Sequence, residues 1–199
     1  MTISEPMTLA TDYLLAAVTA WLGSLLFKHR ESQLCRLWWT LAFAALAVGA
    51  FLGGTWHGFF QAPALWIATL VVLGVASCAM LAGSVLATLS GAPRNLMLAL
   101  AGGKLLLYLV WLLERSDFFV VIVDTGIAFA VVAALHLWRF NGWIASGILV
   151  SVAAALVQAS GFALHEHFNH NDLYHVIQIA AMALLYRGAR RLTDAGAFG

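Results

Sequence analysis

Residues 64–89, ALWIATLVVLGVASCAMLAGSVLATL, contain no charged residue and decide the fold class of the chain. The stretch exceeds the roughly 20 residues that an α-helix needs to cross a bilayer. Lipid offers the backbone no hydrogen-bond partners, so an apolar stretch of this length must be helical. The sequence therefore predicts an all-α membrane protein.

The rest of the chain repeats this pattern. It is 63% hydrophobic and only 10% charged, with a mean hydropathy of +0.92, whereas soluble domains are about 25% charged. The net charge of +1 leaves no basic surface for a nucleic acid.

Length gives the number of spans. With about 20 residues per span and about 6 to 8 per connecting break, 199 residues accommodate seven spans. We predict a single domain over residues 1–199, a bundle of seven transmembrane helices. Their expected ranges are about 9–27, 37–56, 64–89, 95–113, 118–138, 143–164 and 172–187.

Basic residues in alternate breaks predict the orientation in the membrane. The first, third and fifth breaks and the tail are basic, and they hold Lys28, Arg30, Arg36, Arg94, Arg139, Arg187, Arg190 and Arg191. By the positive-inside rule the N-terminus lies outside and the C-terminus in the cytoplasm. The start through Thr11 has no Lys or Arg, so we expect a permanent first helix rather than a signal peptide. We expect the inner membrane of a bacterium.

Polar residues gather at the predicted outer end of the bundle. The stretch 165–175, HEHFNHNDLYH, precedes and opens the last helix, for which Asn171 or Asp172 is the expected N-cap. Asp172, His175 and Gln178 are spaced i, i+3, i+6 and so lie near one helix face. Asp12 and His57 belong to the same end. Ionisable side chains in membrane helices should face the bundle interior rather than lipid.

These residue types suit a metal site. Neutral imidazole is the commonest protein metal ligand, and a catalytic zinc takes three protein ligands and a water. His57, His175 and one of His170, Asp172 or Asp12 could supply them, and we predict His57, His170 and His175. Asp172 and Asp12 would then be the catalytic carboxylates. We expect Asn171 and Gln178 to support the ligands by hydrogen bonds.

Two further charges lie within predicted spans. Lys104 and Asp124 belong to consecutive antiparallel helices, at depths that a lysine side chain can bridge. We predict a structural ion pair, with a proton or ion path as the alternative.

The seven spans, the histidine late in the second and the histidine motif opening the seventh resemble the CREST superfamily of alkaline ceramidase and adiponectin-receptor-like membrane hydrolases. The resemblance implies zinc held by one histidine on the second helix and an HxxxH pair on the seventh, with a metal-bound water that cleaves a lipid amide. His57 and His175 match this pattern. Gly53 stands where the pattern has serine, Asn171 where it has the first HxxxH histidine, and residues 64–89 lack its aspartate. The chain also resembles uncharacterised bacterial seven-helix proteins.

Three functions follow as hypotheses. The first is a zinc-dependent integral membrane hydrolase that acts on a lipid amide or ester at the outer face. The second is a non-catalytic membrane subunit or receptor, partnered by another membrane protein or a second copy, with a structural or pH-sensing histidine cluster. The third is a small transporter or proton channel that uses Lys104 and Asp124. The lack of an internal repeat weighs against the third.

Overall fold

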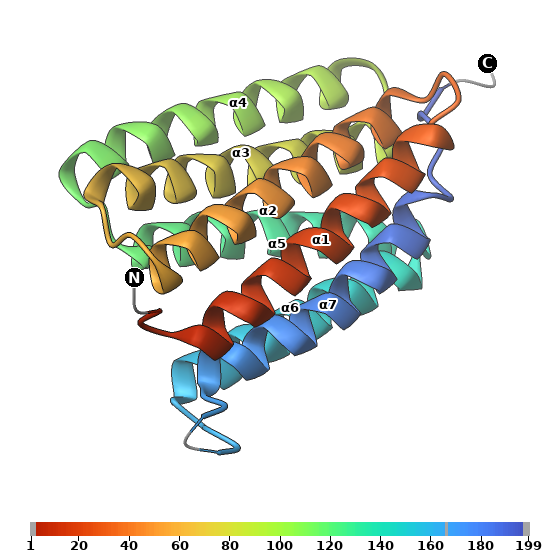
Figure 1. Ribbon diagram of the computed structural model, residues 1–199. Helices are drawn as coiled ribbons and strands as arrows, with labels where there is room; N and C mark the ends of the chain where they lie inside the picture. Colours follow the sequence, from red (N-terminus) through yellow and green to blue (C-terminus); the bar gives the residue numbers. More distant parts are fainter. Residues whose placement is uncertain (1–2, 166, 197–199) are drawn as a thin grey trace.

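The computed structural model describes residues 3–165 and 167–196, and it is all-α there. Figure 1 shows the helices running along one common direction. They are α1 (Pro6–Lys28), α2 (Leu34–Gly58), α3 (Pro63–Thr88), α4 (Gly91–Glu114), α5 (Phe118–Trp138), α6 (Gly142–Ser160) and α7 (His170–Ala189). Within the described ranges the only β pairing is an isolated bridge between His165 and Phe168.

Six of these helices, α1 to α6, are long and apolar enough to cross a membrane. The chain is therefore suited to a lipid bilayer. Helix α7 differs because its first turns carry Asp172, His175 and Gln178, all of which are buried in the bundle.

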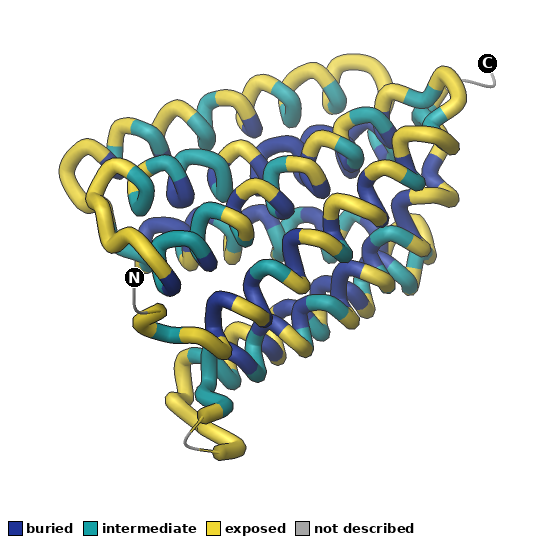
Figure 2. Tube along the Cα trace, in the orientation of Figure 1, coloured by how far each residue is buried: buried dark blue, intermediate teal, exposed yellow. Residues whose placement is uncertain are grey.

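Six helices form a closed ring. The contacts run from α1 to α2, α2 to α3, α3 to α5, α5 to α6, α6 to α7 and back from α7 to α1. Helix α4 lies outside this ring and packs mainly on α3. Only three of its residues are buried, and Figure 2 shows exposed and intermediate residues along most of its length.

Close helix contacts in the ring depend on small residues. A Cβ at Gly188 of α7 would lie 2.9 Å from the backbone nitrogen of Ile144, and one at Gly147 of α6 would lie 3.0 Å from that of Leu185. Glycine at both positions lets the two backbones approach, as is common between membrane helices.

Several helices depart from the expected ranges by a few residues. Helices α1, α2 and α4 begin three or four residues early, and the last two also differ. Helix α6 ends at Ser160 instead of residue 164, because Gly161 adopts a left-handed conformation with φ 68°. Helix α7 begins at His170 instead of residue 172. Its N-cap is Asn169, and Asp172 completes a capping box with the Asn169 backbone. The prediction of Asn171 or Asp172 as the N-cap was therefore wrong by two or three residues.

Lys104 of α4 lies against Asp124 of α5. The distance from Lys104 Nζ to Asp124 Oδ1 is 2.5 Å, and Nζ also donates to Ser77 Oγ of α3 at 3.0 Å. The Asp124 carboxylate is almost fully buried, and its Oδ2 bonds no group of the described residues. This polar contact joins the outlying α4 to two helices of the ring.

The segment after α7 caps the start of α2. The Asp194 carboxylate accepts hydrogen bonds from the backbone nitrogens of Leu34 at 2.8 Å and Cys35 at 2.7 Å. Its own backbone nitrogen donates to Gln33 Oε1 at 2.6 Å. A residue distant in sequence thus supplies the N-terminal cap that the α2 N-cap residue lacks.

We expect Asp194→Ala to lower the free energy of unfolding by about 1 to 2 kcal/mol, because two backbone donors and the positive end of α2 lose their partner. Asp194→Asn keeps one acceptor oxygen and should lose less. The measurement is thermal or denaturant unfolding of the purified protein in detergent. Equal stability of Asp194→Ala and the wild type would contradict the capping role.

For the ion pair, Lys104→Leu should destabilise the protein by about 3 to 5 kcal/mol, because it leaves a buried carboxylate without its counter-charge. The double variant Lys104→Leu with Asp124→Leu should recover most of that loss, since two apolar groups replace two charges. Unfolding in detergent measures both. A double variant as unstable as the single one would contradict a structural role for the pair.

Candidate functional site

The ring encloses a cavity of about 300 Å³ near the end of the bundle where α1, α3, α5 and α7 begin, called here the site end. All six ring helices contribute to its lining. The polar lining residues are Asp12, Thr19, His57, Thr69, Gln158, Asn171, Tyr174, His175 and Gln178. The sequence-predicted site residues Asp12, His57, Asn171, His175 and Gln178 therefore share one cavity.

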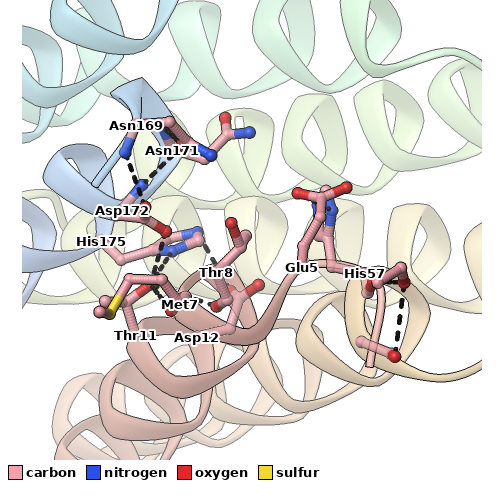
Figure 3. Close-up of polar contacts among 12 residues, drawn as sticks. Glu5, Met7, Thr8, Thr11, Asp12, His57, Asn169, Asn171, Asp172 and His175 are labelled. Atoms are coloured by element: carbon pink, nitrogen blue, oxygen red, sulfur yellow. Dashed lines mark hydrogen bonds and ion pairs between the residues drawn. The ribbon is translucent and has the colours of Figure 1, made fainter. Parts of the chain in front are cut away.

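Asp12 of α1 and His175 of α7 are paired across the point where the first and last helices meet. His175 Nε2 lies 3.1 Å from Asp12 Oδ1, and both side chains are less than 10% exposed. Figure 3 shows the imidazole pointing from α7 toward α1. Both residues line the cavity, so this acid–base pair is in reach of anything bound there.

The other imidazole nitrogen is held as well. His175 Nδ1 lies 3.0 Å from the Thr11 hydroxyl, and that hydroxyl lies 3.4 Å from Asp172 Oδ1 (Figure 3). Asp172 in turn accepts from the Asn169 backbone nitrogen at 2.7 Å. Hydrogen bonds at the second nitrogen fix the orientation of an imidazole ring. Asp172, expected to be catalytic, is buried and does not line the cavity, so it acts here as a capping and positioning residue.

His57 approaches the cavity from α2. Its Nδ1 lies 3.3 Å from Glu5 Oε2, just before α1. Ser4 donates its hydroxyl to the His57 backbone oxygen at 2.6 Å, so the segment before α1 is fastened to the end of α2. His57 is partly exposed, in contrast to the buried His175.

Amide side chains complete the polar part of the lining. Gln158 of α6 donates to Asn171 Oδ1 at 3.0 Å, and Gln178 donates to Ser151 Oγ at 3.1 Å. With its oxygen used in this way, Asn171 retains its amide hydrogens for another acceptor. Asn171 and Gln178 were expected to support the metal ligands by hydrogen bonds. In the structure each of them instead bonds a side chain of α6.

The lining becomes apolar toward the middle of the bundle. Along α1, Asp12 is followed on the same face by Leu15 and Thr19, about 10 Å deeper at 1.5 Å per residue. On α7 the sequence of lining residues after His175 is Gln178 and then Met182. Leu46 and Leu73 line the same deep part. A cavity with a polar mouth and an apolar floor fits an amphiphilic molecule.

The three predicted zinc ligands do not all meet at this cavity. His57 and His175 line it, but His170 does not. Within residues 3–165 and 167–196, no group of three or more His, Cys, Asp or Glu side chains is placed to hold a metal ion. Both nitrogens of His175 already face protein groups. The residues as arranged do not fit the predicted zinc site.

The remaining histidines of the predicted outer cluster lie away from the cavity. His165 and His167 are exposed in the loop before α7, and Glu166 between them lies outside the described residues. The predicted pair Lys104 and Asp124 lies between α4 and α5 and does not line the cavity.

Sequence reasoning missed several residues around the cavity, among them Gln158, Thr11 and Glu5. Thr11 holds His175 Nδ1, and Glu5 approaches His57. Thr11 directly precedes Asp12, and this adjacency is the weak sequence signal that could have indicated its place in the site. Glu5 could not have been found, because its role depends on the path of the segment before α1.

Comparisons with known proteins add a family. Residues 7–194 match the family described as "Family of unknown function (DUF6962)". No curated protein and no solved structure matches the chain. The matched residues cover nearly all of the chain and include both Asp12 and His175. The protein therefore belongs to the DUF6962 family.

Proposed function

We propose that this protein is an integral membrane hydrolase that binds a lipid amide or ester in the ring cavity. The observation that carries the proposal is the Asp12–His175 pair on a cavity that is polar at its mouth and apolar at its floor. A lipid amide or ester has the same division, with a polar head group and acyl chains. Its head would lie beside Asp12 and His175, and an acyl chain would extend toward Leu46 and Met182.

The proposal includes the placement in the membrane. All seven helices would cross the bilayer, with the site end at the outer face of a bacterial inner membrane. The basic residues of the opposite end, including Arg94, Arg139 and Arg191, support this orientation. Lipid substrates would then enter from the outer leaflet.

The chemistry follows from the pair. Both His175 nitrogens face protein groups, so the base is the Asp12 carboxylate, which His175 Nε2–H holds at Oδ1. Asp12 Oδ2 takes a proton from a water in the cavity as that water attacks the carbonyl carbon. The protonated Asp12 then returns the proton to the leaving amine or alkoxide as the C–N or C–O bond breaks. The Asn171 amide donates to the carbonyl oxygen as it becomes negative. Thr11 and Asp172 keep the ring oriented from its far side.

The main test is lipid hydrolysis by the full chain in lipid nanodiscs, followed by mass spectrometry of released fatty acid. We expect Asp12→Asn to lower the rate by about 10²- to 10⁴-fold, the usual contribution of a general base. His175→Gln should lower the rate by less, because Asp12 then loses the imidazole that orients it. His29→Gln is the matched control, because His29 is exposed at the other end of α1. An Asp12→Asn protein as active as the control would refute the mechanism.

Zinc is tested separately. Since the predicted zinc ligands do not converge in the structure, we expect hydrolysis to continue after dialysis against a chelator, and metal analysis to find no stoichiometric zinc. Activity that disappears on chelation and returns with added zinc would show that the resemblance to the zinc hydrolases was the better guide. Loss of bound zinc in His57→Ala and His175→Ala would then identify the ligands.

The second candidate function is a non-catalytic lipid-binding membrane protein. It is favoured by one observation, that both His175 nitrogens lie against protein groups. In that case the purified protein would retain a bound lipid that stays intact on incubation. His175→Gln would lower lipid retention without any product appearing for either protein.

A further inference from the structure

A second pocket lies at the other end of the bundle, where α5 ends and α6 begins. Its volume is about 420 Å³, and its lining includes Arg139, Asn141, Trp143, Ser146 and Arg191. Among the residues that the structure describes, no carboxylate contributes to this lining, in contrast to the first cavity. The pocket is therefore positively charged.

Contacts with neighbouring groups hold the arginines in place, and none of these contacts within the described residues is with a carboxylate. Arg139 directs Nε and Nη2 to the Thr88 backbone oxygen, which leaves its Nη1 group for another acceptor. Arg187 and Arg191 both lie over the Trp143 ring, at 4.1 and 5.6 Å from its centre. Across residues 3–165 and 167–196, none of these three arginines lies within ion-pair distance of a carboxylate.

The backbone and a hydroxyl add to this pocket. Helix α6 begins at Gly142, and its N-cap Asn141 makes no side-chain cap. Asn141 instead donates its side-chain amide to the Gly188 oxygen at 3.4 Å. The uncapped start of α6 thus presents free N–H groups beside the arginines, and Ser146 lines the pocket one turn later. Arginine with free backbone donors suits a phosphate group.

The aromatic residues around the pocket indicate a membrane lipid as the source of that phosphate. Phe140 is 95% exposed and has a φ of 56°, a conformation that bulky residues rarely adopt. Trp138 is also exposed, and the Arg139 guanidinium lies over its ring. Exposed aromatic rings at the end of membrane helices mark the level of the lipid head groups. Basic pockets between helices at that level are suited to anionic head groups.

We propose that this pocket binds the phosphate of an anionic phospholipid through Arg139, Arg191 and the start of α6. Arg187 lies over the Trp143 ring and adds to the positive field of the pocket. The site lies at the opposite end of the bundle from the cavity of Asp12 and His175, and it does not depend on the proposed hydrolysis.

The test is lipid binding to the purified full chain in detergent, measured by native mass spectrometry with phosphatidylglycerol and phosphatidylcholine as probes. We expect the wild type to prefer phosphatidylglycerol. Arg191→Gln should weaken phosphatidylglycerol binding about fivefold, the effect of one basic residue near a lipid surface, and leave phosphatidylcholine binding unchanged. Arg190→Gln is the matched control, because Arg190 is the adjacent exposed arginine and does not line the pocket.

Four outcomes would decide against the proposal or change the source of the phosphate. Equal losses in Arg190→Gln and Arg191→Gln, or no preference for phosphatidylglycerol, would overturn the site. Displacement of phosphatidylglycerol by millimolar inorganic phosphate would overturn the lipid as the ligand and indicate a soluble phosphate compound. Arg191→Lys guards against misfolding. It keeps the charge, so it should bind more tightly than Arg191→Gln, and the reverse order would also contradict the proposal.

Discussion

Closure of the ring between α1 and α7 is the contact on which the cavity depends. The other neighbours in the ring are mostly consecutive helices, joined by short breaks, whereas α1 and α7 come from opposite ends of the chain. The polar contacts at this closure are those of Asp12, Thr11, Asp172 and His175. Because α4 is left outside, α3 contacts α5 directly and the ring has six members. The space inside it becomes the cavity.

Burying the polar side chains of Asp12 and His175 at this closure costs desolvation free energy, and their position on the cavity gives a reason for that cost. A carboxylate and an imidazole buried within a membrane bundle contribute little to stability, since desolvation offsets most of their attraction. Leucine pairs of similar size would pack at least as well. Polar residues retained in such a place are more readily explained by chemistry than by folding. The same reasoning separates this pair from Lys104 and Asp124, which join α4 to the ring and do not line the ring cavity.

The number of helices and most of their bounds could be predicted, because lipid leaves an uncharged stretch such as residues 64–89 no conformation but a helix. The position of α4 outside the ring could not. In a membrane, helices are apolar on every face, so periodicity does not tell which face meets lipid and which meets protein. The Asp194 cap of α2 was missed for a related reason, since it joins residues about 160 positions apart and depends on the tertiary fold.

The site was predicted in part. Asp12, His57 and His175 could be grouped because alternating spans place them at one end, and the structure gives them a common cavity. His170 was expected beside them from its nearness in sequence to His175. It instead occupies the first position of α7, where Asn169 and Asp172 cap the helix. For His170, spacing along the chain predicted the correct end of the bundle but not the side of α7 on which the residue lies.

Two departures from the zinc-hydrolase pattern become interpretable in the structure. A Cβ at Gly53, where that pattern has serine, would lie 3.9 Å from both carboxylate oxygens of Asp12. The carboxylate on α1 thus borders the position from which a serine hydroxyl would project. Asn171, at the position of the missing histidine, accepts from Gln158 and links α7 to α6. Neither Gly53 nor Asn171 offers the group that the metal pattern has at its position, whereas Asp12 places an acid directly against His175. The polar centre of this structure therefore lies between α1 and α7.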